Sequence, residues 1–219
     1  MDRAETTTIA VRAGPVALTG DLVVPGAPRG VVLFAHGSGS SRHSPRNRAV
    51  ARHLTDHGLA TLLVDLLTAD EEDAERRTGH LRFDIMLLIE RLDAALDRLR
   101  SDPATAALPV GCFGASTGAA AALGVAGRRP SDVAAVVARG GRPDLTPPEL
   151  LAAVRAPTLL IVGGDDAPVI AMNRDAQRRM AIAAELRIVP GATHLFAEPG
   201  ALERVAELAA GWFARHLRA

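Results

Sequence analysis

Lysine is absent from this chain of 219 residues. All 25 basic residues are arginines, and 25 acidic residues balance them to a formal net charge of zero. Because the chain has no excess of positive charge, its composition does not indicate a nucleic-acid partner or an anionic membrane surface. The sequence is also rich in alanine, and we interpret the arginine bias as a habit of the source genome rather than as a functional signal.

Cysteine is almost as scarce, since Cys112 is the only one. A single cysteine excludes an intrachain disulfide and a cysteine-rich metal site, and we expect neither a metal nor another cofactor. Cys112 lies in an apolar stretch, where a buried and unreactive thiol is expected. No stretch is apolar for long enough to cross a bilayer, and the first eight residues lack the apolar segment of a signal peptide. We therefore predict a cytoplasmic protein with no membrane partner.

Apolar runs typical of buried strands alternate with segments of helical periodicity along the whole chain. The predicted strands that follow the first pair are Val31–Ala35, Leu59–Asp65, Pro109–Phe113, Val133–Ala138, Thr158–Val162 and Glu185–Val189. The predicted helices cover about 44–58, 80–100, 117–127, 147–154 and 169–180, with a last one opening at Glu198-Pro199. Residues 6–24 alternate apolar and polar positions around a Gly14-Pro15 turn, which predicts an antiparallel pair at a sheet edge.

This alternation predicts an α/β protein with a mostly parallel sheet of about eight strands and helices on both faces. We expect one domain over residues 1–219, without repeats or linkers. The acidic stretch from Asp70 to Arg77 is expected to be a solvated loop or a short helix. The segment from Gly140 to Pro157 is too short for a large cap domain, so a site at this sheet should be open to solvent.

The segment Gly114-Ala115-Ser116-Thr117-Gly118 fits the G-x-S-x-G pattern between a predicted strand and a predicted helix. In a nucleophile elbow of this kind the serine occupies a strained turn that exposes its hydroxyl. Glycine is needed on both sides because a β-carbon there would strike the neighbouring strand or helix. Ser116 is therefore the predicted nucleophile; the alternative is a simple helix N-cap.

Asp166 and His194, like Ser116, each follow a predicted strand. The carboxyl ends of parallel strands share one edge of a sheet, so these three side chains should meet there. Serine needs a base to remove its proton, which His194 can do, and a carboxylate such as Asp166 can orient the imidazole. The order Ser, Asp, His is that of α/β-hydrolases. Asp165 remains an alternative for the acid, and His194 could instead be an ordinary loop histidine.

Hydrolysis through a serine also needs N–H donors aimed at the developing oxyanion. The backbone N–H of Thr117 at the helix N-terminus is the first predicted donor. We expect the second from the glycine-rich loop after Val31–Ala35, at Ser38, with Gly37 or Gly39 as alternatives. His36 at the end of that strand is expected to brace the loop rather than to act as a base.

These motifs together resemble the α/β-hydrolases of the dienelactone hydrolase-like group, and the resemblance covers nearly the whole chain. It rests on four segments: His36–Gly39, Gly114–Gly118, Gly163–Asp166 and Gly191–His194. The resemblance implies a catalytic triad of Ser116, Asp166 and His194. Dienelactone hydrolases proper use a cysteine nucleophile where this chain has Ser116, which points to a general ester or thioester hydrolase rather than to dienelactone itself.

Several basic side chains follow strands at the same predicted edge. These are Arg42, His43, Arg46, Arg139 and Arg142. If they converge near Ser116, they would favour a substrate that carries a carboxylate or a phosphate, since arginine binds either group through two hydrogen bonds. The alternative is that they pair with Asp65, Asp144 or Glu149 and hold loops together.

The sequence thus predicts a serine hydrolase that cleaves a small ester, lactone or thioester through an acyl-enzyme intermediate. The expected partner is a small-molecule ester-type substrate that could be anionic. Two alternatives remain: acyl transfer to an acceptor other than water, as in perhydrolases, and a non-catalytic binding protein on a hydrolase fold.

Overall fold

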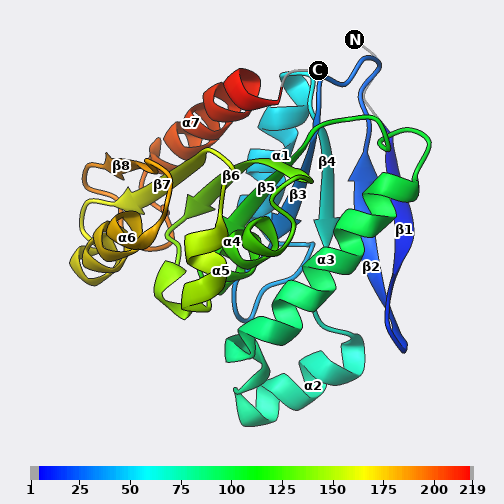
Figure 1. Ribbon diagram of the computed structural model, residues 1–219, viewed down its shortest axis with the longest axis horizontal. Coiled ribbons are helices and arrows are strands. Elements are labelled where there is room, and N and C mark those ends of the chain that lie inside the picture. Colours follow the sequence, from blue (N-terminus) through cyan, green and yellow to red (C-terminus); the bar gives the residue numbers. More distant parts are fainter. Residues whose placement is uncertain (1–4, 218–219) are drawn as a thin grey trace.

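A computed structural model describes residues 5–217 and contains one sheet of eight strands (Figure 1). The strands are β1 (Thr6–Ala13), β2 (Val16–Val23), β3 (Val31–Ala35), β4 (Ala60–Val64), β5 (Val110–Ala115), β6 (Val133–Arg139), β7 (Thr158–Gly163) and β8 (Glu185–Val189). Their order in the sheet is β1-β2-β4-β3-β5-β6-β7-β8. The expected single domain over 1–219 includes residues 1–4 and 218–219, which lie outside the described residues.

The sheet is antiparallel at one edge and parallel elsewhere. β1 and β2 form the predicted hairpin, closed where Ala13 pairs with Val16, and β2 runs antiparallel to β4. All pairs from β4 to β8 are parallel. β4 lies on one side of β3 and β5 on the other, so the chain changes direction across the sheet at β3. In an open α/β sheet, ligands bind beside such a point, at the carboxyl ends of the strands.

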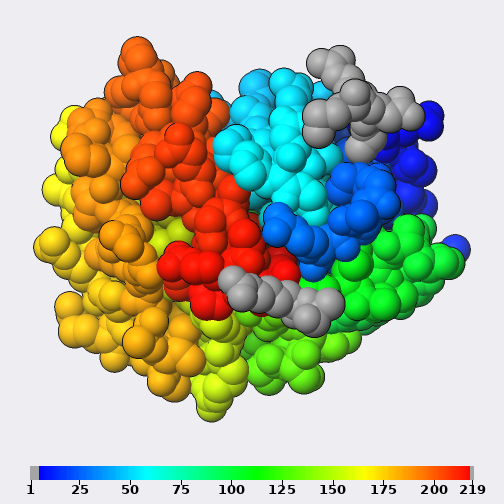
Figure 2. Space-filling model, turned by 90° about the horizontal axis from the view of Figure 1, so that it is seen from above, coloured from blue at the N-terminus to red at the C-terminus, as the bar shows by residue number. Residues whose placement is uncertain are grey.

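Helices cover both faces of the sheet. The α-helices are α1 (Pro45–Asp56), α2 (Ala69–Thr78), α3 (Ile85–Ser101), α4 (Thr117–Arg128), α5 (Pro148–Ala153), α6 (Ala167–Arg179) and α7 (Ala201–His216), and two short 3-10 turns are η1 (Leu81–Phe83) and η2 (Pro143–Leu145). α1 and α7 lie side by side on one face (Figures 1 and 2), while α3 and α4 pack together on the other. The predicted α/β-hydrolase architecture is confirmed, and only η2 and α5 occupy the segment between β6 and β7.

Two apolar cores lie on the two faces of the sheet because successive side chains of a strand point in opposite directions. In β3, Leu33 packs in the core beneath α3 and α4, while Val32 and Phe34 pack in the core beneath α1 and α7. All five residues of β3 are buried, as the continuous apolar run predicts. Cys112 is fully buried in β5, and burial raises the pKa of its thiol to about 12, so the thiol is protonated and inert as expected.

α4 lies so close to its neighbours that only small side chains fit along much of it. Its residues from Thr117 to Gly127 are all buried. A β-carbon on Gly124 would collide with the side chain of Ile89 in α3. The run of alanine and glycine in this helix therefore reflects tight packing between α3 and the sheet.

Two helix boundaries differ from the predicted ones. The helix expected from His80 begins at Ile85, because the Asp84 side chain accepts a hydrogen bond from the N–H of Leu87 and caps α3, leaving residues before it in η1. The last helix begins at Ala201 rather than at Glu198. The acidic stretch from 70 to 77 is helical and belongs to α2, which starts with a capping box. None of the helices within 5–217 is long and apolar enough to cross a membrane.

Candidate active site

Ser116 occupies a sharp turn between β5 and α4. Its backbone has φ 52° and ψ −121°, and a positive φ is strained for a residue with a β-carbon. The N–H of Ser116 donates to the carbonyl of Arg139, and its own carbonyl accepts from the N–H of Arg142, at 3.1 Å each. The end of β6 and the loop after it therefore hold the strained turn in place.

The two glycines that flank this turn permit the close packing that the sequence pattern predicts. A β-carbon on Gly114 would lie less than 3 Å from the backbone of Gly118 and Ala119 in α4. A β-carbon on Gly118 would lie less than 3 Å from the backbone carbonyls at the end of β3. The turn can therefore form only if both positions lack a side chain.

The loops after β5, β7 and β8 bring Ser116, Asp166 and His194 together. Nδ1 of His194 lies 2.7 Å from Oδ2 of Asp166, and Nε2 lies 3.3 Å from Oγ of Ser116. A carboxylate can only accept, so Nδ1–H donates to Asp166 and the neutral ring leaves Nε2 free to accept from the Ser116 hydroxyl. In this arrangement His194 can receive the serine proton.

Asp165 lies next to Asp166 but does not reach His194. Its backbone N–H donates to the carbonyl of Ala192, and its side chain is exposed. The Asp166 side chain is only 14% exposed and contacts the imidazole. The geometry therefore favours Asp166 over Asp165 as the partner of His194.

Glu198 supports the loop that carries His194, a contact that the sequence analysis missed. Its carboxylate accepts from the backbone N–H of Thr193 at 3.1 Å and from the Thr193 hydroxyl at 2.6 Å. These hydrogen bonds lower the pKa of Glu198, which favours the ionised carboxylate. Glu198 lies before α7 rather than at its start, and nothing in the local sequence indicates its bond to Thr193.

The glycine-rich loop after β3 lies against the start of α4. The hydroxyls of Ser38 and Thr117 are 3.0 Å apart, and a β-carbon on Gly37 would lie 3.0 Å from the carbonyl oxygen of Ala115 and from Cβ of Ser116. Within residues 5–217, the backbone N–H groups of Ser38 and Thr117 have no hydrogen-bond acceptor. Both N–H groups are thus available to a ligand near Ser116.

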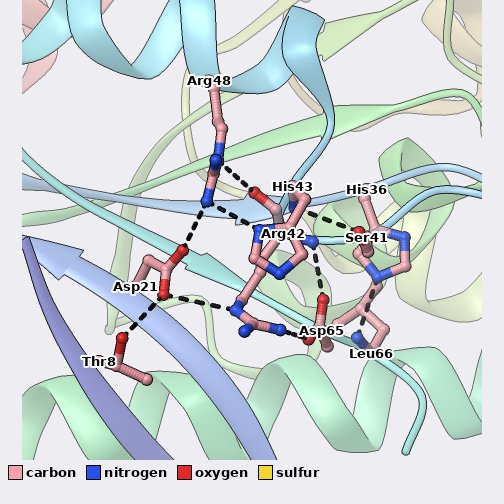
Figure 3. Close-up of polar contacts among 9 residues, drawn as sticks. All are labelled: Thr8, Asp21, His36, Ser41, Arg42, His43, Arg48, Asp65 and Leu66. Atoms are coloured by element: carbon pink, nitrogen blue, oxygen red, sulfur yellow. Dashed lines mark hydrogen bonds and ion pairs between the residues drawn. The ribbon is translucent and has the colours of Figure 1, made fainter. Parts of the chain in front are cut away.

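His36 holds this loop in place through hydrogen bonds of its buried ring. Its Nδ1 lies 3.0 Å from the carbonyl of Gly37, and its Nε2 lies 3.0 Å from the N–H of Leu66 (Figure 3). The carbonyl must accept and the amide must donate, so His36 is the neutral tautomer with the proton on Nδ1. Burial lowers its pKa, which favours the same neutral form. His36 makes the bracing contacts that were expected of it.

The five basic residues expected near Ser116 have different environments. Arg42 forms ion pairs with Asp65 and with Asp21, and Arg48 of α1 also pairs with Asp21 (Figure 3). His43 contacts Arg48 at 2.8 Å through Nδ1. These contacts connect the loop after β3 to β2 and to the end of β4. The pairing of Arg42 with Asp65 agrees with the alternative that these arginines hold loops together.

Arg142 is also paired, in this case with Asp144. Its Nε and Nη2 both bind the Asp144 carboxylate, at 2.9 and 2.8 Å. This bidentate contact raises the pKa of Arg142. Glu149, the third acidic partner considered from the sequence, is exposed on α5.

Arg46 and Arg139 are the two arginines that reach the pocket beside Ser116. The pocket has a volume of about 180 Å³. Its walls come from the loop after β3, the first turn of α1, the elbow and the His194 loop, and its lining comprises Gly37, Ser38, Ser40, Ser44, Arg46, Asn47, Ala115, Ser116, Arg139, His194 and Leu195. Four of these residues, Ser40, Ser44, Asn47 and Leu195, were not predicted from the sequence to belong to the site. No cluster of three or more His, Cys, Asp or Glu side chains suited to a metal occurs in the described part of the chain.

Comparison with known proteins relates this chain and its fold to one family. The family model described as "Dienelactone hydrolase family" matches residues 18–217. The chain belongs to the dienelactone hydrolase family. A solved dienelactone hydrolase from Anabaena variabilis shares 57% sequence identity, with coverage of 99% of this chain and 100% of that chain and a TM-score of 0.96.

A more distant solved structure shares the fold of this chain. Est1E from Butyrivibrio proteoclasticus is 14% identical, with a TM-score of 0.79 and coverage of 95% of this chain and 98% of that chain. Among curated proteins, one from Mycobacterium tuberculosis H37Rv named "Putative phosphoribosyl transferase" is 56% identical over 209 residues. That match covers 95% of this chain but 46% of the relative, so the chain spans about half the length of the curated relatives it matches.

Proposed function

We propose that the protein is a serine hydrolase that cleaves a small-molecule ester, lactone or thioester. The observation that carries this proposal is the continuous contact from Ser116 through His194 to Asp166. In the proposed reaction His194 removes the Ser116 proton as Oγ attacks the substrate carbonyl, and Asp166 stabilises the imidazolium. His194 then returns the proton to the leaving group, which leaves an acyl group on Ser116.

Water completes the proposed cycle. It attacks the acyl-enzyme carbonyl and gives a proton to His194. The bond between the acyl carbon and Oγ of Ser116 then breaks, His194 returns the proton to Oγ, and the acid leaves, with no cofactor needed. The N–H groups of Thr117 and Ser38 would stabilise the oxyanion of each tetrahedral intermediate. Two observations support these donors. Neither N–H has an acceptor within residues 5–217, and the hydroxyls of Ser38 and Thr117 are in contact, which places the two residues side by side next to Ser116.

The name of the mycobacterial relatives suggests a different chemistry, but those proteins are about twice as long as the matched region. The family match of this chain is to dienelactone hydrolases over residues 18–217. We therefore propose hydrolysis for the region that this chain shares with them.

Substitution of Ser116 by alanine tests the proposal. With a short-chain p-nitrophenyl ester as substrate, we expect kcat/KM to fall by at least about a thousandfold, since the acyl-enzyme cannot form. Undiminished hydrolysis by this variant would refute the assignment. Added alcohols or hydrogen peroxide in the same assay separate hydrolysis from acyl transfer, because a transferase would convert the ester mainly into the product of the added acceptor.

A further inference from the structure

The pocket beside Ser116 holds positive charge that the protein itself does not neutralise. Arg46 and Arg139 both line it, and no aspartate or glutamate is among its lining residues in the described part of the chain. Arg42 and Arg142, which lie nearby in sequence, each bind a carboxylate. The charges that face the pocket are therefore distinct from those that hold the loops.

Arg139 is the more unusual of the two because it is buried without a counterion. Only 7% of the residue is exposed, its Nε has no hydrogen-bond partner, and its Nη2 makes a long contact of 3.4 Å with Oδ1 of Asn47. Its guanidinium also lies over the ring of Phe196 at 5.8 Å. Burial and the nearby charge of Arg46 lower its pKa to about 10. An uncompensated buried charge is costly, and a bound anion would offset that cost.

The first turn of α1 adds to this positive region. Ser44, its N-cap, and Arg46 and Asn47 in its first turn all line the pocket. The N-terminus of a helix carries a partial positive charge that attracts anions, and the first turn of α1 contains no acidic residue. In addition, Nε of Arg46 has no hydrogen-bond partner. The helix terminus and both guanidiniums thus face one space.

We propose that Arg46 and Arg139, together with the first turn of α1, bind a phosphate group carried by the substrate. This inference rests on the proposed hydrolase function and names the substrate class: an ester that also bears a phosphate. The phosphate serves for recognition and stays intact, while the bond broken at Ser116 is the acyl carbon–oxygen or carbon–sulfur bond.

Charge and donor number favour phosphate over carboxylate. A phosphate monoester carries close to two negative charges near neutral pH and has three acceptor oxygens, which matches two guanidiniums and the hydroxyls of Ser40 and Ser44 on the pocket wall. A carboxylate has one charge and would leave one guanidinium unneutralised. Arginine binds phosphate in a bidentate manner, and both arginines line the pocket.

Isothermal titration calorimetry with inorganic phosphate at about pH 8, where the dianion predominates, tests this subsite. We expect Arg139→Gln and Arg46→Gln each to weaken phosphate binding by about 10- to 100-fold, since each removes charge-assisted hydrogen bonds. Arg48→Gln is the matched control: Arg48 lies on the same helix, pairs with Asp21 and is absent from the pocket lining, so its phosphate affinity should equal that of the unmodified protein. Arg46 is less buried than Arg139, so it keeps the test valid if the Arg139 variant misfolds.

Acetate and phosphate, compared in the same titrations, separate the two anion chemistries. We expect acetate to bind at least about tenfold more weakly than phosphate, since it meets two guanidiniums with one charge. Phosphate should also inhibit hydrolysis of a neutral p-nitrophenyl ester competitively. Equal phosphate affinity in all three arginine variants, or acetate binding as tight as phosphate binding, would overturn the proposal.

The Ser116→Ala variant distinguishes failure of this subsite from failure of the proposed hydrolase function. The variant should lose hydrolysis and keep phosphate binding, because Ser116 adds no charge to the subsite. Hydrolysis that persists in Ser116→Ala would refute the catalytic assignment. If Arg46→Gln and Arg139→Gln bind phosphate as tightly as the unmodified protein, the subsite alone is refuted.

Discussion

Replacement of Asp166 by asparagine would change the hydrogen-bonding state of His194 with almost no change in volume. In the native protein the Asp166 carboxylate accepts the Nδ1–H of His194 at 2.7 Å. An asparagine can instead donate its amide N–H to Nδ1, which moves the imidazole proton to Nε2. Nε2 would then present a hydrogen to Ser116 and could no longer accept the serine proton.

The expected magnitude follows from this contact. Loss of one hydrogen bond to a charged group costs about 1.5–3 kcal/mol, which corresponds to a loss of about 10- to 150-fold in rate. The reversed tautomer adds to this, and an analogous substitution in serine proteases lowers kcat about 10⁴-fold. We therefore expect kcat/KM of Asp166→Asn to fall by about 10³- to 10⁴-fold.

Asp165→Asn is the matched control, because the exposed Asp165 side chain does not contact His194. Steady-state hydrolysis of a p-nitrophenyl ester should show a change of less than about threefold for this variant, with circular dichroism to confirm that both variants fold. If Asp166→Asn keeps activity within tenfold of the unmodified protein, or if Asp165→Asn causes the larger loss, the argument about the His194 tautomer is wrong.

Two further predictions concern stability. Gly118→Ala places a β-carbon less than 3 Å from the backbone carbonyl of Ala35 and should lower the free energy of unfolding by about 1–3 kcal/mol or more. Gly211→Ala places its new β-carbon in open space in α7 and should raise the free energy of unfolding by about 0.5–1 kcal/mol. Urea unfolding measures both, and an equal effect of the two substitutions would contradict the packing argument. His36 has a lowered pKa in the folded protein, so below about pH 6.5 the unfolded chain binds more protons than the folded one. The free energy of unfolding should therefore fall as the pH drops below about 6.5, by up to about 1.4 kcal/mol per pH unit from this one group. His36→Gln, which can still donate and accept a hydrogen bond, should reduce this pH dependence, and an unchanged profile would show that His36 is not its source.

The sequence predicts the sheet well because a strand buried on both faces leaves a recognisable apolar run in the sequence. A strand covered on both sides must be apolar at every position, and β3 (Val31–Ala35) is so throughout. Ser116, Asp166 and His194 could be grouped without coordinates for a similar reason, since each follows a strand and parallel strands end at one edge. The local sequence therefore predicts both the buried strands and the edge at which these side chains meet.

The roles of the arginines could not be predicted in this way. Arg42 and Arg46 are four residues apart, yet Arg42 pairs with Asp21 and Asp65 whereas Arg46 faces the pocket. Asp21 lies on β2, and its approach to Arg42 depends on how β2 pairs with β4, which is a long-range property of the sheet. Periodicity within a segment contains no information about such a contact.

Covalent labelling with a fluorophosphonate, followed by peptide mass spectrometry, tests the central claim most directly. The reagent reacts with a serine hydroxyl that a neighbouring base has activated. We predict modification of the folded protein at Ser116 alone, with no labelling of the Ser116→Ala variant and with labelling strongly slowed in His194→Ala. A native protein that remains unlabelled, or that is labelled at another serine, would contradict the proposed hydrolase mechanism.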